Sequence, residues 1–180
     1  MLSSLKRETG ETSITVKLDL TGTGAVQADT GVQLLDEILR TLGEASGFDL
    51  VVLAKGDLRT GDHHTTEDVG ITLGSVLARL IRTGIGSCAV AMGECLAHAA
   101  ISFGEPGYFG DFSLGAREVD GMALENFGHF ARSAAYNGRF TLHLNAKGGN
   151  DYQKVIAMMT AMGRALKRAA QDGKATNTYD

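Results

Sequence analysis

Two stretches of this chain match one another: Phe48-Asp49-Leu50-Val51-Val52-Leu53-Ala54-Lys55-Gly56 and Phe140-Thr141-Leu142-His143-Leu144-Asn145-Ala146-Lys147-Gly148. Phenylalanine, leucine, alanine, lysine and glycine recur between them at a constant offset of 92 residues. A second match, at an offset of 89, starts at Asp62 and Asp151 and continues through Gly74 and Gly163. A repeat of about half the chain length predicts two similar halves, because each copy of a repeat forms one structural unit.

Each half predicts the same coarse order of strands and helices. Alternating or short apolar runs predict strands at 13–20, 48–53, 107–114 and 140–145. Helical spacing predicts helices at 34–42, ending near Gly43, and at 66–82, 122–135 and 152–170, with a loose polar tail after Gln171. The predicted fold class is α+β: a duplicated two-layer α/β sandwich with helices on one face of each sheet. The halves are expected at 1–88 and 89–180, within one compact unit.

Composition excludes several classes of protein. The chain has 180 residues, of which 43% are hydrophobic and 21% charged, as is usual for a folded globular protein. Its net charge of -4 offers no basic surface for nucleic acid. No apolar run approaches the roughly 18–20 residues of a membrane helix. The two cysteines, Cys88 and Cys95, are too few for a disulfide scaffold, so we expect a cytoplasmic protein.

The stretch Asp62-His63-His64-Thr65-Thr66-Glu67-Asp68 carries the strongest chemical pattern. Spacings of three and four residues place His63, His64 and Glu67 near one another on a helix surface. Two imidazoles and a carboxylate are a recurrent ligand set for zinc, manganese or iron. Asp62 is expected to cap the helix. The alternative interpretation is a polar helix start with incidental histidines.

The remaining histidines are weaker candidates. His143 replaces Val51 of the first half, which suggests a specific use, although a half-buried structural histidine is the commoner reading of such a residue. His98 and His129 lie in stretches rich in alanine or aromatic residues. They are expected to be surface or core histidines rather than ligands.

Motifs in the same order along nearly the whole chain resemble the imidazoleglycerol-phosphate dehydratase family. The central block, His63 to Gly74, is the most specific of them. The others are Arg7 to Thr12, Thr30-Gly31, Leu35-Asp36, Phe48-Asp49-Leu50, Gly56-Asp57-Leu58, Met92-Gly93-Glu94 and Thr141-Leu142-His143.

The resemblance implies a fold, an assembly and an activity. It implies a duplicated α+β fold of the ribosomal protein S5 domain 2 type and a 24-subunit shell of one chain. It implies paired manganese ions at subunit interfaces, bound by histidines and glutamates from both halves. The family dehydrates imidazole glycerol phosphate to imidazole acetol phosphate in histidine biosynthesis, with the metals stabilising an imidazolate-like intermediate.

The resemblance also shows where this chain departs from the family. Of eight implied metal ligands, His63, His64, Glu67 and His143 are retained. Glu37 stands where the family has a histidine and is itself a plausible ligand. The second His-His-x-x-Glu set is replaced by Tyr152, Gln153 and Ile156. One manganese ion is therefore expected rather than two, with zinc or iron as alternatives. Glu11, Glu67 and Glu94 remain as candidate catalytic acids.

Positions that the resemblance implies for substrate phosphate have changed as well. Ser87 and Glu105 stand where the family has arginines, and Gly93 stands where it has an aspartate. The family's C-terminal Ser-x-Lys-Gly is absent from 176–180. Glutamate in place of arginine opposes phosphate binding, because the sign of the interaction reverses.

Two functions stay open at this point. The first is a manganese-dependent hydro-lyase, the dehydratase itself, with impaired or altered activity. The second is a non-catalytic or repurposed paralogue that keeps the fold and assembly and binds one metal or a different small-molecule ligand. It would form a homo-oligomer or assemble with an active paralogue. Losses at both metal and phosphate positions favour the second.

Overall fold

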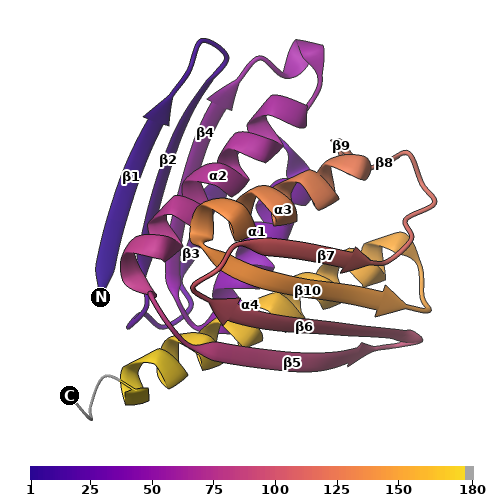
Figure 1. Ribbon diagram of the computed structural model, residues 1–180. Helices are drawn as coiled ribbons and strands as arrows, with labels where there is room; N and C mark the ends of the chain where they lie inside the picture. Colours follow the sequence, from indigo (N-terminus) through magenta and orange to yellow (C-terminus); the bar gives the residue numbers. More distant parts are fainter. Residues whose placement is uncertain (177–180) are drawn as a thin grey trace.

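The structure, a computed structural model, describes residues 1–176 of the chain. Two four-stranded sheets have the strand orders β1-β2-β4-β3 and β5-β6-β10-β7 (Figure 1). In both, the first two pairings are antiparallel and the third is parallel. The strands are β1 Leu2–Glu8, β2 Thr12–Asp19, β3 Val26–Asp29, β4 Asp49–Gly56, β5 Ile85–Met92, β6 Cys95–Phe103, β7 Gly107–Asp111 and β10 Phe140–Lys147. The identical order confirms the predicted duplication.

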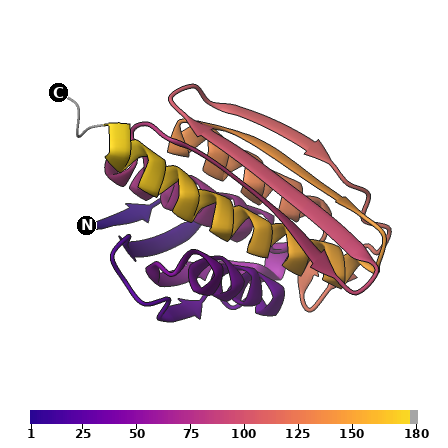
Figure 2. The same cartoon turned by 90° about the horizontal axis from the view of Figure 1, so that it is seen from below.

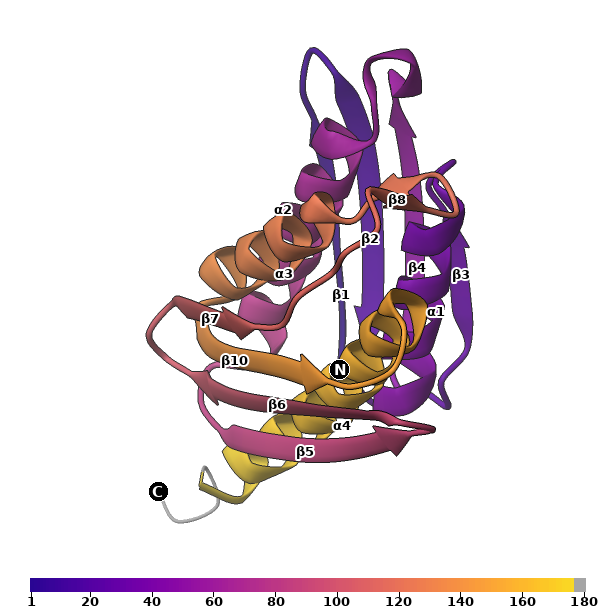
Figure 3. The same cartoon turned by 90° about the vertical axis from the view of Figure 1, so that its right-hand side faces the viewer.

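Four helices lie between the two sheets (Figures 1 and 2). They are α1 Gln33–Ser46, α2 His63–Leu80, α3 Glu125–Gly138 and α4 Asp151–Thr176. Each sheet therefore carries helices on one face, as predicted, and buries its alternate apolar side chains against them. A short hairpin, β8 Glu118–Val119 and β9 Met122–Ala123, crosses near the start of α1 (Figure 3). None of the helices in the described residues is long and apolar enough to cross a membrane.

Two glycines related by the repeat bring the halves together. A Cβ on Gly74 of α2 would lie 2.4 Å from the backbone oxygen of Ala134 in α3. A Cβ on Gly163 of α4 would lie 2.6 Å from the backbone oxygen of Leu42 in α1. Leu42 and Ala134 are themselves 92 residues apart. Each half therefore packs its second helix on the first helix of the other half, with an approach that only glycine allows.

Several helix boundaries differ from the predictions, and three of the differences have a clear physical reason. Helix α1 runs through Gly43, which is buried with its Cα facing Val26, and ends at Gly47, where φ is 72°. The expected helix over 122–135 begins later, because Met122 and Ala123 pair with β8. The expected loose tail after Gln171 is instead the last turn of α4, in which Gly173 is buried. Residues 177–180 lie outside the described residues.

Sequence periodicity missed half of the eight strands that form the two four-stranded sheets. β1, β3, β5 and β6 were not predicted, and β7, shorter than the expected 107–114 strand, is the counterpart of β3 rather than of the 13–20 strand. β6 alternates correctly, but its inward positions include alanines, whose apolar periodicity is weak. The position expected to divide the halves, between residues 88 and 89, lies within β5.

Candidate metal centre

The retained ligand candidates of the first half lie in the first two turns of α2. The side chains of His63 and Glu67 are 46% and 40% exposed, so both remain accessible to a ligand. Asp62 precedes the helix, but its side chain does not cap it. Its carboxylate instead accepts hydrogen bonds from Thr66 Oγ1 (3.1 Å), the Ala123 amide (3.2 Å) and Asn126 Nδ2 (3.0 Å). The predicted cap is therefore wrong: Asp62 ties α2 to β9 and α3.

Asn126 fixes the orientation of His63. Its Nδ2 donates to Asp62, which leaves its Oδ1 as an acceptor 2.9 Å from His63 Nδ1. An amide oxygen cannot donate, so Nδ1 of His63 carries a proton and Nε2 keeps its lone pair when the ring is neutral. A histidine whose other ring nitrogen donates to an oxygen is in the state preferred for metal ligation. Nε2 faces Glu67 Oε2 at 3.5 Å.

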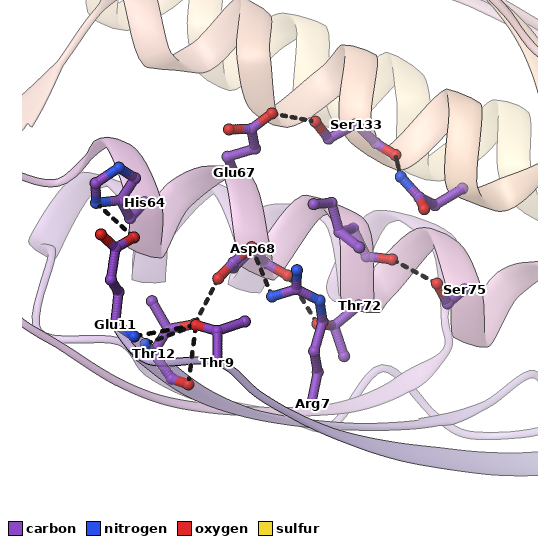
Figure 4. Close-up of polar contacts among 12 residues, drawn as sticks. Arg7, Thr9, Glu11, Thr12, His64, Glu67, Asp68, Thr72, Ser75 and Ser133 are labelled. Atoms are coloured by element: carbon purple, nitrogen blue, oxygen red, sulfur yellow. Dashed lines mark hydrogen bonds and ion pairs between the residues drawn. The ribbon is translucent and has the colours of Figure 1, made fainter.

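The remaining partners of this helix end come from the β1–β2 hairpin and from α3 (Figure 4). His64 Nδ1 lies 3.1 Å from Glu11 Oε2, in the β1–β2 turn. Glu67 Oε1 accepts a 3.4 Å hydrogen bond from Ser133 of α3. One helical turn below, Asp68 pairs with Arg7 of β1 at 2.7 Å and accepts from Thr12 of β2. These contacts fasten the β1–β2 hairpin to α2 and hold Glu11 beside His64.

The equivalent end of α4 has no comparable ligand set. The Tyr152 hydroxyl donates to Glu37 of α1, and this hydrogen bond to a carboxylate raises the pKa of the phenol. Gln153 and Asn150 form a reciprocal pair: the backbone N–H of Asn150 donates to Gln153 Oε1 at 3.0 Å, and the backbone N–H of Gln153 donates to Asn150 Oδ1 at 2.9 Å. This is a capping box. Ile156 packs against the hydrophobic core. All three positions serve the local structure.

Two other candidates lie away from the α2 end within one chain. His143 is exposed on the face of β10 opposite to buried Leu142 and Leu144, so it points away from the helix layer. Its ring stacks on Phe109 of β7, with centroids 4.6 Å apart. Glu94 is exposed in the β5–β6 turn, the counterpart of the turn that carries Glu11. Within the described residues, no three His, Cys, Asp or Glu side chains converge as a ready metal group.

The sequence interpretation missed two residues at this site. Asn126 gave no recognisable pattern, because its role depends on helix packing between the halves. His129 of α3 is exposed, as expected for a surface histidine, yet its ring centroid lies 5.0 Å from that of His63. The repeat offset of 92 makes His129 the counterpart of Glu37 in the first half. That relation was available from the sequence and could have singled out His129.

Residues at the implied phosphate positions carry no cationic side chain. Ser87 lies on β5, Gly93 forms the β5–β6 turn, and Glu105 is exposed in the loop before β7. The implied C-terminal segment lies almost wholly outside the described residues. A cavity of 720 Å³ borders Asp62, with Phe112, Leu114 and Arg117 among its lining residues. Arg117 is a cation near the site that the sequence interpretation did not consider.

Fold and site together define a duplicated α+β protein with a candidate metal-ligating motif at the start of one repeated helix. The sequence model of a family described as imidazoleglycerol-phosphate dehydratase matches residues 30–166. The chain belongs to the imidazoleglycerol-phosphate dehydratase family of histidine biosynthesis.

Individual relatives agree with this family. The chain is 39% identical over 176 residues to imidazoleglycerol-phosphate dehydratase of Desulforudis audaxviator, covering 94% of this chain and 90% of the relative. It is 37% identical over 169 residues to the enzyme of that name in Methanocaldococcus jannaschii, covering 92% and 86%. The crystal structure of the Staphylococcus aureus dehydratase matches with a TM-score of 0.83 at 28% identity, covering 94% of this chain and 98% of that one.

Proposed function

We propose that this chain is a dehydratase-family protein with one metal half-site in place of two, and that its imidazoleglycerol-phosphate dehydratase activity is strongly impaired. One observation carries the proposal: the residues at the start of α4 are engaged in structural contacts. Tyr152 binds Glu37, Gln153 completes a capping box and Ile156 packs on the core. None of these three side chains offers an imidazole or a carboxylate to a metal.

The α2 end, by contrast, fits a divalent ion. His63 presents a free Nε2 because its Nδ1 donates to Asn126, and the Glu67 carboxylate lies 3.5 Å from that nitrogen. His63, His64 and Glu67 would hold the ion, with His143 supplied by a neighbouring subunit because it faces away from this site in its own chain. Manganese is the ion proposed, with zinc or iron as alternatives for the same donors. When bound, the ion supplies Lewis acidity.

Two candidate acids flank the site and one does not. Glu11 accepts from or pairs with His64 according to the charge of that ring, and Glu67 faces His63. Glu94 lies in the β5–β6 turn, next to the start of α4. We propose Glu11 and Glu67 as the acids able to act on a ligand at α2. Glu37 is a weaker ligand candidate, because Tyr152 already occupies its carboxylate.

A change of ligand accompanies the change in metal site. Ser87, Gly93 and Glu105 leave the implied phosphate positions without positive charge, so a phosphate ester loses its oriented contacts. The alternative function is a repurposed or partner subunit that binds a different small molecule, in a cytoplasmic homo-oligomer or beside an active paralogue. The cavity next to Asp62, with Arg117, Glu118 and Glu125 on its wall, has a size that favours a small molecule over nucleic acid or membrane.

Metal content and turnover of the same preparation test this proposal. The full chain is purified without added metal or chelator, dialysed against Mn²⁺, and analysed by mass spectrometry for ions per chain. We expect about one ion per chain and dehydratase turnover at least about 100-fold below that of a family member with all eight ligands. About two ions per chain with ordinary turnover would overturn the proposal.

A further inference from the structure

We infer that the cavity beside Asp62 is a binding site for an α-amino acid with a cationic side chain. The cavity has a volume of 720 Å³, which lies within the range of small-molecule sites. It borders the start of α2, but none of the proposed metal ligands lines it. The inference deepens the alternative function of a subunit that binds a small molecule, and it does not depend on the metal half-site.

Most of the cavity wall belongs to a connection that only the second half possesses. In the first half, residues 30–32 join β3 to α1. In the second half, residues 112–124 join β7 to α3 and include the β8–β9 hairpin. The fold does not require this longer segment, because the first half forms the same sheet order without it. Long ordered connections of this kind commonly carry binding sites.

Backbone contacts hold this segment in place without a ligand. The amides of residues 115–116 both donate to Oδ2 of Asp151, at 2.9 and 2.7 Å. The amide of Leu124 donates to the backbone oxygen of Arg117 at 3.0 Å, which closes the β8–β9 hairpin. A cavity whose wall is already fixed loses little conformational freedom when a ligand binds. The site is therefore preformed.

Three charged residues of the wall are available to a ligand. Arg117, Glu118 and Glu125 are exposed, and within residues 1–176 no ion pair or side-chain hydrogen bond engages any of them. Asp62, the fourth charged residue of the wall, is buried, and its carboxylate already accepts three hydrogen bonds. The available groups are therefore one guanidinium and two carboxylates.

A basic amino acid carries the complementary set of charges. Its carboxylate pairs with Arg117, because a planar guanidinium binds a carboxylate through two parallel hydrogen bonds. Its α-ammonium group and its side-chain cation pair with Glu118 and Glu125. Its methylene groups contact the apolar part of the wall, which includes Phe112 and Leu114. A ligand with negative charge alone is disfavoured, because the wall has more carboxylates than guanidinium groups.

Titration calorimetry with three probes tests the site. L-Lysine is the full probe, cadaverine is lysine without its carboxylate, and L-leucine lacks the side-chain cation. The full chain is titrated after dialysis against Mn²⁺ and again after the metal is removed with a chelator. We expect lysine to bind equally to both preparations, and cadaverine and leucine to bind at least about tenfold more weakly than lysine.

Variants of the wall assign each charge. Arg117→Gln should weaken lysine binding about tenfold and leave cadaverine binding unchanged, because cadaverine has no carboxylate to lose. The double variant Glu118→Gln/Glu125→Gln should weaken the binding of both probes. Arg164→Gln and Glu44→Gln change exposed residues that do not line the cavity, so these matched controls should bind as the wild type does. Circular dichroism verifies that each variant is folded.

Four results would overturn the inference. They are the absence of lysine binding up to about 10 mM, leucine binding as tight as that of lysine, an equal effect of Arg117→Gln on lysine and cadaverine, and lysine binding that requires Mn²⁺. The last would place the ligand at the metal centre. The proposed function fails separately: two ions per chain with ordinary turnover would overturn it and leave lysine binding intact.

Discussion

The starts of α2 and α4 occupy equivalent places in the two halves, yet they are built for different purposes. At α2, His63, His64 and Glu67 stay partly exposed and are positioned by contacts from neighbouring elements. At α4, the equivalent residues are Tyr152, Gln153 and Ile156, and each makes a contact that supports the local structure. The same backbone position therefore supports either binding chemistry or local stability.

The aspartates at the starts of the two helices, Asp62 just before α2 and Asp151 as the first residue of α4, show what both ends share. Asp62 accepts hydrogen bonds from Ala123, Asn126 and Thr66, and Asp151 accepts from the amides of Gly115 and Ala116. The Ala116 and Gly115 amides lower the pKa of Asp151. Both aspartates fasten a helix start to the segment between β7 and α3. The duplicated framework is thus conserved between the halves, and the divergence is confined to the side chains just after it.

The largest expected effect comes from substituting the two glycines that make equivalent helix contacts in the two halves. Gly74→Val and Gly163→Val each place atoms within the contact distance of a facing helix backbone, so each should lower the free energy of unfolding by about 3 kcal/mol or more. Urea denaturation followed by circular dichroism measures the loss. Gly10→Val, where nothing lies within 4 Å, is the control and should change stability little. A mild effect at only one of the two glycines would contradict the equivalence of the helix contacts.

The next largest effect is expected when the start of α4 is given the metal-ligating residue types of the start of α2. Tyr152→His, Gln153→His and Ile156→Glu in one variant should add about one manganese ion per chain, since they recreate the donor types present at α2. Metal analysis after dialysis against Mn²⁺ measures it, with His98→Gln in the wild-type background as the control. The loss of the cap and of the Ile156 packing should reduce stability at the same time. Unchanged metal content would show that the second-half ligand positions are wrongly assigned.

Much of the fold could be predicted from the sequence because the repeat shows the same patterns twice. Phe140 to Gly148 and Gly163 match their first-half counterparts, and both pairs lie at equivalent places in the structure. Strands such as β6 escaped detection because small inward residues leave little hydrophobic contrast. The ends of helices depended on tertiary contacts: Gly43 continues α1 since it packs on Val26, which no local rule predicts.

The site was readable only where its residues are neighbours in sequence. His63, His64 and Glu67 lie within one helical turn, so their spacing predicted their proximity. Asn126 and His129 come to the same place through packing of α3 on α2, which follows from the fold and not from a local motif. The contact between Glu37 and Tyr152 is of the same kind: it joins two substituted positions that lie 115 residues apart, so no local motif predicts it.

The smallest effect sharpens the contrast at a single position. Gln153→Ala removes one side of the capping box and should cost about 1 kcal/mol of stability, whereas His64→Ala, at the equivalent position of α2, should cost less than about 0.5 kcal/mol. The difference arises because Gln153 satisfies a backbone amide that has no helical partner, while exposed His64 contacts the Glu11 carboxylate and the edge of the His63 ring. Urea denaturation of both variants, with Asn150→Ala and the Asn150–Gln153 double variant completing a cycle, isolates the coupling. Additive losses in that cycle would mean that Gln153 is not part of a cap, and the start of α4 would lose its structural explanation.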